Sequence, residues 1–483
     1  MTDRYRTEHD SLGTKEVPAG AYWGIQTLRA VENFPITGVT IARFPHLIRA
    51  LALVKKAAAH ANMELGILEP TVGEAISWAC DQLLENRHHD QFVVDVFQGG
   101  AGTSTNMNAN EVIANLALER LDREKGDYDR CHPNDHVNLS QSTNDVYPTA
   151  IKIALYTRLE DMTTAMAELK NAFALKEVEL ADVIKMGRTQ LQDAVPMTLG
   201  QELGAFAVMI GEDIRRLHEA KQLLREMNLG ATAIGTGINA PREYVDLVRL
   251  HLNRFGRLSF FTSVNLVEAT QDSGVFVQLS GVFKRFAIKL SKICNDLRLL
   301  SSGPRAGLNE INLPPMQPGS SIMPGKVNPV IPEVVNQICF QVIGNDVTIS
   351  MAAEGGQLQL NVMEPVMLFN LHRSIDLLTN GCRVLAGRCV TGITANREIC
   401  RQYVERSAGL VTALVPVIGY ERASELAQEA LRTGRGLVAL VLERGYLSRE
   451  EVEDLLRPEN MTGAGPGPII GDTAKPGREE EVP

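Results

Sequence analysis

The stretch 149–184, TAIKIALYTRLEDMTTAMAELKNAFALKEVELADVI, decides the fold. It runs for more than thirty residues without a glycine or a proline, whereas an average helix in a globular protein has roughly 11–12 residues. Similar long patterns recur at 198–229, 264–302, 330–354 and 364–388. Helices of this length with continuous apolar stripes pack best against one another. The sequence therefore predicts an all-α fold with a central bundle of long helices.

The segments before and after these patterns predict shorter elements. Residues 1–45 carry many turn formers, so we expect an irregular arm there. Helical spacing starts near Pro45, near Thr71 and near Asn106. Four short helices are expected after the long ones, at 396–403, 422–433, 436–444 and 448–456, the last with a capping box from Ser448 to Glu451. The alternating stretch FQVIGNDVTIS, 340–350, lies inside a helix-length pattern, so we expect it to be helical.

The chain is longer than one hydrophobic core usually supports. We expect an N-terminal helical domain at 1–142, a central long-helix domain at 143–397 and a small C-terminal helical domain at 398–461. Residues 462–483 are rich in glycine and proline and end in charged residues, which predicts a flexible tail.

Composition narrows the classes of function. The formal net charge is −10, which gives no general attraction to nucleic acid or to an anionic membrane. An anionic substrate would therefore need positive charge concentrated locally. Seven cysteines without a C-x-x-C pair indicate reduced thiols. The polar start and the lack of a membrane-length apolar run favour a cytoplasmic protein.

The candidate site begins with the loop Gly319–Pro329, GSSIMPGKVNP. Glycine and proline block regular structure there, while Ser320, Ser321, Lys326 and Asn328 supply a possible base, several donors and one positive charge. A connector without chemistry is the simpler alternative. A nucleotide-binding P-loop is excluded, because five residues separate the two glycines and a valine follows the lysine.

Three other polar segments each lie beside a long helical pattern. They are GGAGTSTN at 99–106, SQSTND at 140–145 and GRTQLQDAVP at 187–196. Singly, each is more often a tight turn, a helix cap or a loop between helices. Together with the loop at 319–329 they offer many donors, few acids and one or two cations, which suits a small dicarboxylate.

Other candidates carry less weight. His132 and His136 have a ligand-like spacing, but Pro133 between them makes an ordinary loop the better interpretation. The pair His88-His89 lacks further ligands nearby. No G-x-G-x-x-G follows a strand, so nicotinamide or flavin binding has no support. We expect neither a cofactor nor a metal at the site.

With these four segments in this order, the chain resembles the aspartate ammonia-lyases (aspartases) of the aspartase/fumarase superfamily over nearly its whole length. The stretches at 8–34, 228–241 and 291–314 carry the same resemblance. It implies a three-domain all-α subunit and a homotetramer whose active sites each combine segments of three subunits. It also implies reversible deamination of L-aspartate to fumarate and ammonium.

The resemblance implies a role for each matching residue. Ser320 would be the base that removes a Cβ proton and leaves an aci-carboxylate. The β-carboxylate would be held by Thr103, Ser142, Thr143 and Ser321. The α-carboxylate would be held by Thr189, Lys326 and Asn328, and the amino group by Asn144 together with Gln190. Gly319 and Gly325 suit hinges that let the loop close over the substrate.

Class II fumarate hydratase is the rival within the superfamily. Three features favour the ammonia-lyase: Val330-Ile331 follows the loop where fumarases have Thr-Gln, Thr143 replaces a second serine, and Gln190 replaces a histidine. A structural protein recruited from the superfamily is a non-enzymatic alternative, and the intact Ser320 and Lys326 argue against it. A helical binding scaffold would show a charged or apolar docking face rather than four donor-rich loops.

Overall fold

The computed structural model describes residues 4–456, 460 and 462 of the 483-residue chain. The chain forms two compact units. Unit 1 comprises Met1–Ala167, Ile210–Ser291 and Val334–Arg383, and unit 2 comprises Glu168–Met209, Lys292–Glu333 and Val384–Pro483. The unit boundaries fall inside or beside the long helices, so each unit contains parts of them. The division into three domains stays a prediction.

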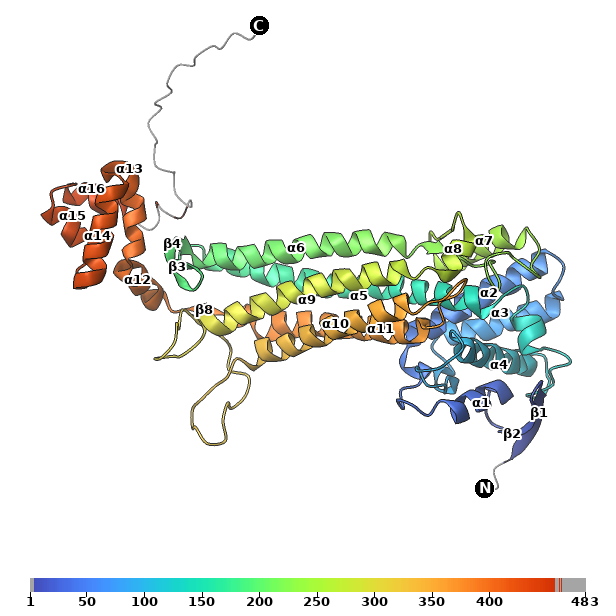
Figure 1. The fold of residues 1–483 in the computed structure, drawn as a ribbon. Coiled ribbons are helices and arrows are strands. Elements are labelled where there is room, and N and C mark those ends of the chain that lie inside the picture. Colours follow the sequence, from blue (N-terminus) through green and yellow to red (C-terminus); the bar gives the residue numbers. More distant parts are fainter. Residues whose placement is uncertain (1–3, 457–459, 461, 463–483) are drawn as a thin grey trace, which may run out of the picture. The chain divides into compact units, whose positions relative to one another are not determined.

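Five long helices dominate the fold and confirm the all-α prediction (Figure 1). They are α5 (Thr143–Glu179), α6 (Leu199–Leu223), α9 (Gly274–Leu300), α10 (Val330–Glu354) and α11 (Glu364–Arg388). The bounds of α10 and α11 match the predicted ranges. The pattern at 264–302 is divided into α8 (Leu266–Gln271) and α9, because Asp272 accepts the Gly274 N–H at 3.0 Å and turns the chain between them.

Within unit 1 the long helices lie side by side (Figure 1). Asp346 of α10 accepts from Ser280 of α9 at 2.7 Å, and Asn345 of α10 donates to Ser374 of α11 at 3.0 Å. Between these polar contacts the helices bury large apolar side chains, among them Leu159, Phe283, Phe286, Leu371 and Ile375. Each such side chain contributes roughly 1.5–3 kcal/mol when fully buried, so apolar packing holds the bundle together.

The shorter helices of unit 1 begin close to where the sequence predicts. They are α2 (Pro45–Glu64), α3 (Pro70–Leu84), α4 (Thr103–Arg120) and α7 (Tyr244–Gly256). Helix α4 starts three residues before the expected Asn106. Gly102 precedes it with φ +88°, and a Cβ there would lie 2.3 Å from the Tyr147 ring. Only glycine therefore fits this close approach.

The prediction of an irregular arm at 1–45 is wrong. Strands β1 (Tyr5–Asp10) and β2 (Gly13–Pro18) pair antiparallel, followed by α1 (Ile25–Asn33) and a 3₁₀ turn, η1 (Ile41–Arg43). The buried carboxylate of Glu8 accepts from the Ile25 N–H at 2.8 Å and pairs with Arg6 at 2.8 Å. Arg6 also donates to the carbonyls of Ala21 and Trp23. These contacts order a segment that its turn formers marked as irregular.

The C-terminal part of unit 2 packs short helices on a hairpin. Strands β3 (Ile184–Thr189) and β4 (Gln192–Thr198) pair antiparallel, which corrects two expectations. Helix α5 ends at Glu179 instead of continuing to Ile184. The segment 187–196, expected as a loop between two helices, belongs to a hairpin. Ile184 and Met186 are buried in one apolar cluster with Val404 and Leu426.

The helices that follow agree with the sequence prediction, with two additions. They are α12 (Arg397–Arg406), α14 (Tyr420–Thr433), α15 (Leu437–Glu443) and α16 (Arg449–Leu455). The capping box of Ser448 and Glu451 is present at the start of α16. The additions are the 3₁₀ turn η5 (Ala408–Leu414) and helix α13 (Val415–Ile418). The predicted tail at 462–483 lies, apart from Thr462, outside the described residues.

Two further sheets are short. Strands β5 (Glu226–Met227) and β6 (Phe261–Thr262) pair in unit 1, and β7 (Ile311–Asn312) and β8 (Thr394–Ala395) pair in unit 2. Among the described residues, no helix combines the length and the apolar character that crossing a bilayer requires.

Candidate active site

The site residues expected from the sequence form two sets, one in each unit. Unit 1 contains Thr103, Ser142, Thr143 and Asn144, at the starts of α4 and α5. Unit 2 contains Thr189 and Gln190 on the β3–β4 hairpin, and Ser320, Ser321, Lys326 and Asn328 on the loop before α10. Each set has its own supporting contacts.

Thr103 is the first residue of α4, and its side chain is exposed. The turn before it is held by Gln98, whose Oε1 accepts from the backbone nitrogen and the hydroxyl of Thr105 at 2.9 and 3.0 Å. The start of an 18-residue helix presents backbone N–H groups and the positive end of the helix dipole. This end of α4 is suited to an anionic group.

The start of α5 is connected to α4 by one amide side chain. Asn106 Nδ2 donates to the Thr143 hydroxyl at 3.0 Å. Ser142 Oγ accepts from the Asn144 N–H at 3.2 Å and so caps the helix. Asn144 Nδ2 donates to the Ala233 carbonyl at 2.8 Å. In the described part of the chain Asn144 Oδ1 forms no hydrogen bond, and an amide oxygen is the acceptor that an ammonium group needs.

Ser320 has the most distinctive surroundings of the expected site residues. Its Oγ accepts from the backbone nitrogens of Ile322 at 3.2 Å and Met323 at 2.9 Å. Two N–H groups aimed at one oxygen stabilise negative charge on that oxygen and favour loss of its proton. This geometry suits the role of base expected for Ser320, which stays a prediction.

The loop is closed by contacts among its own residues. Gly319 N donates to the Lys326 carbonyl at 2.8 Å, and Asn328 Nδ2 donates to the Gly319 carbonyl at 2.8 Å. A Cβ on Gly319 would lie 2.5 Å from the Lys326 carbonyl oxygen, and Gly325 has φ +81°. Both glycines are thus required by the loop conformation. The contact of Asn328 with an α-carboxylate stays a prediction, since its amide closes the loop in this structure.

Thr189 and Gln190 are exposed at the tip of the β3–β4 hairpin. Gln190 and Leu191 have φ of 54° and 60°, the left-handed values that a type I′ turn requires at both positions. A leucine in this region is strained, and strain of this kind clusters at functional sites. The structure thus gives this segment a defined shape that its sequence did not indicate.

The hairpin is anchored by a buried carboxylate that sequence reasoning missed. Glu310 is fully buried and pairs with Lys185 and Arg188 of β3, each at 2.8 Å. Arg188 immediately precedes Thr189, so this ion pair fixes the approach to the tip. The only sequence signal was an acidic residue inside the stretch 291–314.

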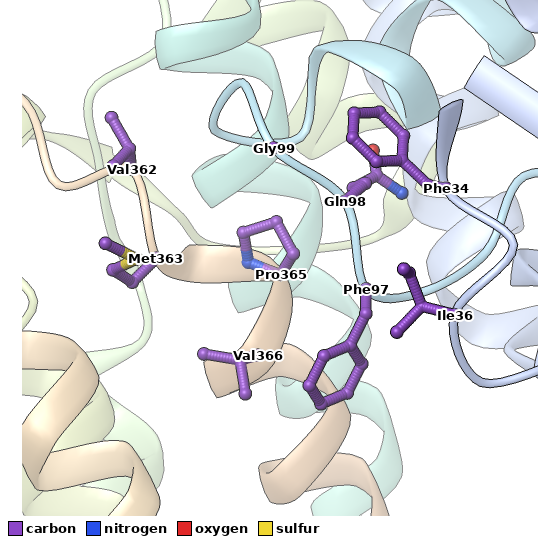
Figure 2. A pocket seen from close by; sticks show the side chains of 9 residues that line it. All are labelled: Phe34, Ile36, Phe97, Gln98, Gly99, Val362, Met363, Pro365 and Val366. Atoms are coloured by element: carbon purple, nitrogen blue, oxygen red, sulfur yellow. The ribbon is translucent and has the colours of Figure 1, made fainter.

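One cavity of unit 1 is apolar and does not suit a dicarboxylate. Figure 2 shows this cavity of about 420 Å³, lined in unit 1 by Phe34, Ile36, Phe97, Gln98, Gly99, Val362, Met363, Pro365 and Val366. Gln98 is its only amide side chain, and no charged side chain lines it. Carboxylates bind where donors and cations gather. The apolar lining does not support placing the candidate site in this cavity, although Gly99 of the segment 99–106 lines it.

Histidine side chains at 132 and 136 have local partners. His132 Nδ1 accepts from the backbone nitrogens of Asn134 and Asp135 at 3.1 and 3.2 Å, and His136 Nδ1 accepts from the His132 N–H at 2.8 Å. Both rings thus hold their own segment, which forms the π-helical turn η3 (Pro133–Val137) instead of the ordinary loop that the sequence favoured. Over the described residues, no three His, Cys, Asp or Glu side chains gather as a possible metal site.

Family comparisons cover most of the chain. The family described as "Lyase" matches residues 13–344, and the family described as "Fumarase C C-terminus" matches residues 410–463. Among solved structures, a fumarate lyase:delta crystallin from Brucella melitensis bound to cobalt superimposes with a TM-score of 0.92. The two chains are 56% identical, and the match covers 94% of this chain and 99% of the Brucella melitensis chain. A class II fumarase from Schistosoma mansoni gives a TM-score of 0.89 at 36% identity, covering 95% and 99%.

Curated relatives point to one branch of this family. An aspartate ammonia-lyase of Helicobacter pylori is 58% identical over 94% of this chain and 97% of its own length. The aspartate ammonia-lyase of Pseudomonas fluorescens is 59% identical, and the match covers 95% of this chain and 96% of the relative. That of Escherichia coli K12 is 53% identical, and the match covers 95% of this chain and 97% of the relative. This chain therefore belongs to the lyase family, together with these aspartate ammonia-lyases.

Proposed function

We propose that this protein is a carbon–nitrogen lyase that deaminates L-aspartate reversibly to fumarate and ammonium. The observation that carries the proposal is the pair of backbone N–H groups, from Ile322 and Met323, aimed at Ser320 Oγ. Identity of 53–59% to curated aspartate ammonia-lyases over nearly the full chain supports the choice of substrate.

The difficult step is removal of a proton from Cβ. An ordinary serine hydroxyl is too weak a base, so its anion must be stabilised by nearby donors. The Cβ–H bond breaks, the proton moves to Ser320 Oγ, and the electron pair moves onto the β-carboxylate as the aci form. That pair then forms the Cα–Cβ double bond while ammonia leaves with the C–N electrons. The proton held by Ser320 passes to ammonia, which gives ammonium.

The remaining residues bind and orient the substrate in this proposal. The β-carboxylate, where the charge develops, lies against Thr103, Ser142, Thr143 and Ser321. The α-carboxylate lies against Thr189, Lys326 and Asn328. Asn144 Oδ1 accepts from the amino group, with Gln190 beside it. Donors placed in advance around a developing charge supply the largest part of such catalysis.

We infer that each active site combines segments of different subunits in a homotetramer. Helix α10 exposes Phe340, Val347 and Met351 along one face, with exposed fractions of 62%, 59% and 64%. A Cβ on Gly344, on the same face, would meet no atom within 4 Å. An apolar helix face of this kind is usually covered by another helix. Light scattering during gel filtration tests the inference, and a monomer would contradict it.

We also infer a reducing, cytoplasmic compartment. All seven cysteines lie in the described part of the chain, and none of them forms a disulfide. In secreted proteins, cysteines are more often paired in disulfide bonds.

The deciding experiment offers L-aspartate and L-malate to the purified protein in parallel and follows fumarate by ultraviolet absorbance. Fumarate from aspartate alone is the expected result. Fumarate from malate alone would replace the proposal by fumarate hydratase, the activity in the name of the Schistosoma mansoni relative. Fumarate from neither substrate would favour a structural protein.

A further inference from the structure

A buried carboxylate lies directly behind the unit 1 part of the proposed site. Asp145 is the third residue of α5 and is 0% exposed. Its oxygens accept from three backbone nitrogens: Ser142 at 3.1 Å, Gly230 at 3.1 Å and Thr232 at 2.9 Å. All three partners are donors, so the geometry fits an ionised carboxylate, which only accepts.

These contacts exceed what a helix cap needs. A capping aspartate accepts from the first turn of its own helix, and here only the Ser142 N–H is local. Gly230 and Thr232 are 85 and 87 residues away in sequence and belong to the loop 228–241. Thr232 has φ 56°, a strained value for a β-branched residue, and this conformation directs its N–H at Asp145.

The same loop also holds the neighbouring site residue. Asn144 Nδ2 donates to the Ala233 carbonyl at 2.8 Å, and Asn228 Nδ2 donates to the Asn144 carbonyl at 3.0 Å. Asp145 therefore fixes the loop that in turn orients Asn144. It also fixes the Ser142 backbone, one residue before Thr143.

A buried lysine supplies the compensating charge. Lys55 of α2 is 0% exposed, and its Nζ donates to Asn138 Oδ1 at 2.8 Å. Asn138 Oδ1 also accepts from Asn106 at 3.2 Å, and Asn106 in turn donates to the Thr143 hydroxyl. Lys55 is thus connected to Thr143 through the side chains of Asn138 and Asn106. Of the other titratable groups, Tyr244 of α7 faces Asp145 and Cys80 of α3 faces Lys55.

Burial brings the pKa values of Asp145 and Lys55 close to each other, near neutral pH. It raises the pKa of Asp145 to about 7, against the lowering effect of the three N–H groups and of Lys55. It lowers the pKa of Lys55 to about 7, against the raising effect of Asp145. Asp145 is the main group that favours the charged form of Lys55, whereas the three backbone N–H groups favour the charged form of Asp145 more than Lys55 does.

We propose that Asp145 is a positioning residue of the substrate site, which holds Ser142, Thr143 and Asn144 in the geometry that binds the substrate's β-carboxylate and amino group. The proposal rests on the proposed function, because it takes these three residues as substrate contacts. Asp145 itself does not touch the substrate.

The test compares Asp145→Asn with a matched variant elsewhere in unit 1. The amide keeps the size of the carboxyl but turns one acceptor into a donor that faces N–H groups. Glu111→Gln is the control, because Glu111 is also buried, accepts from the backbone nitrogens of Gly24, Gln26 and Thr27, and has its pKa raised to about 7 by burial. Both variants therefore lose a comparable structural contact.

We expect Asp145→Asn to raise KM for L-aspartate about 10- to 100-fold, the size expected when a hydrogen bond to a charged group is lost. Its kcat should change less than its KM. The parent enzyme should also lose affinity as pH falls below 7, and this loss should be weaker in Asp145→Asn. Glu111→Gln should keep the parent KM. An unchanged KM in Asp145→Asn, or an equal rise in both variants, would overturn the proposal.

Calorimetric titration with fumarate separates this proposal from the proposed function. A parent protein that binds fumarate but does not deaminate aspartate would reject the proposed function, and weaker fumarate binding by Asp145→Asn would still support the positioning role. A parent that does neither rejects both. If Asp145→Asn does not fold, the double variant Asp145→Asn, Lys55→Met, which leaves neither charge unpaired, takes its place with the same expectation.

Discussion

The side-chain oxygen of Ser320 lies 2.9 Å from the backbone nitrogen of Met323, inside the loop that carries both residues. Both partners of this contact belong to the loop itself. In the proposed mechanism these N–H groups are the donors that stabilise the Ser320 anion.

Replacing Ser320 by alanine should abolish turnover. General bases contribute about 10²- to 10⁴-fold, so kcat should fall by at least 10²-fold. Stopped-flow or steady-state absorbance of fumarate measures the loss, and circular dichroism checks the fold. Ser321→Ala is the matched control in the same loop and should mainly raise KM. Equal losses of kcat in the two variants would contradict the assignment of the base.

Replacing Gly319 by alanine should distort the loop. The added methyl would lie 2.5 Å from the Lys326 carbonyl oxygen, closer than van der Waals contact permits. We expect a loss of activity with little change in thermal stability, because the loop is on the surface. Gly20→Ala is the control, since a Cβ there meets no atom within 4 Å. Full activity in Gly319→Ala would show that the loop conformation is not required.

Replacing Glu310 by alanine should destabilise unit 2. Lys185 is 2% exposed in its side chain, and it would lose one carboxylate partner while Arg188 would lose its only ion pair in the described residues. Breaking a buried pair of this kind costs roughly 3–5 kcal/mol. Chemical denaturation measures the change, and KM should rise because the hairpin carries Thr189. Asp182→Asn, which breaks the exposed pair with Arg397 in the same unit, should change stability far less.

His372 should make the protein less stable in mild acid. Burial lowers its pKa to about 3, and Arg158 and His46 add to this effect. A folded-state pKa below the unfolded value of about 6.5 means that stability is fully present above pH 6.5 and falls as the pH drops toward 3. Between pH 7 and pH 5 this one group should cost about 2 kcal/mol.

Denaturation midpoints of the parent and of His372→Leu at pH 7 and pH 5 measure this contribution. Leucine cannot bind a proton, so the variant should lose less stability on acidification. The exposed His218 provides the control, and His218→Asn should behave like the parent. An identical pH dependence in the parent and in His372→Leu would refute the prediction.

Local sequence patterns were sufficient to predict much of the fold. The bounds of α10 and α11 follow from helical spacing, and Pro329 and Gly355 flank α10. The capping box at Ser448 follows from two residues three apart. The loop 319–329 could be recognised because glycine and proline exclude regular structure there. The resemblance that these segments carry was confirmed by the family match.

Only the tertiary structure revealed the contacts between residues that are distant in sequence. The β1–β2 hairpin depends on Arg6 and Glu8 reaching the segment 21–25, and the β3–β4 hairpin depends on Glu310, more than 100 residues later. Asp145 was visible in the sequence only as the end of a polar run, and its partners at Gly230 and Thr232 were not. The physical reason is that periodicity and turn propensity act over a few residues. A buried charge, in contrast, is stable only where packing brings its partners to it.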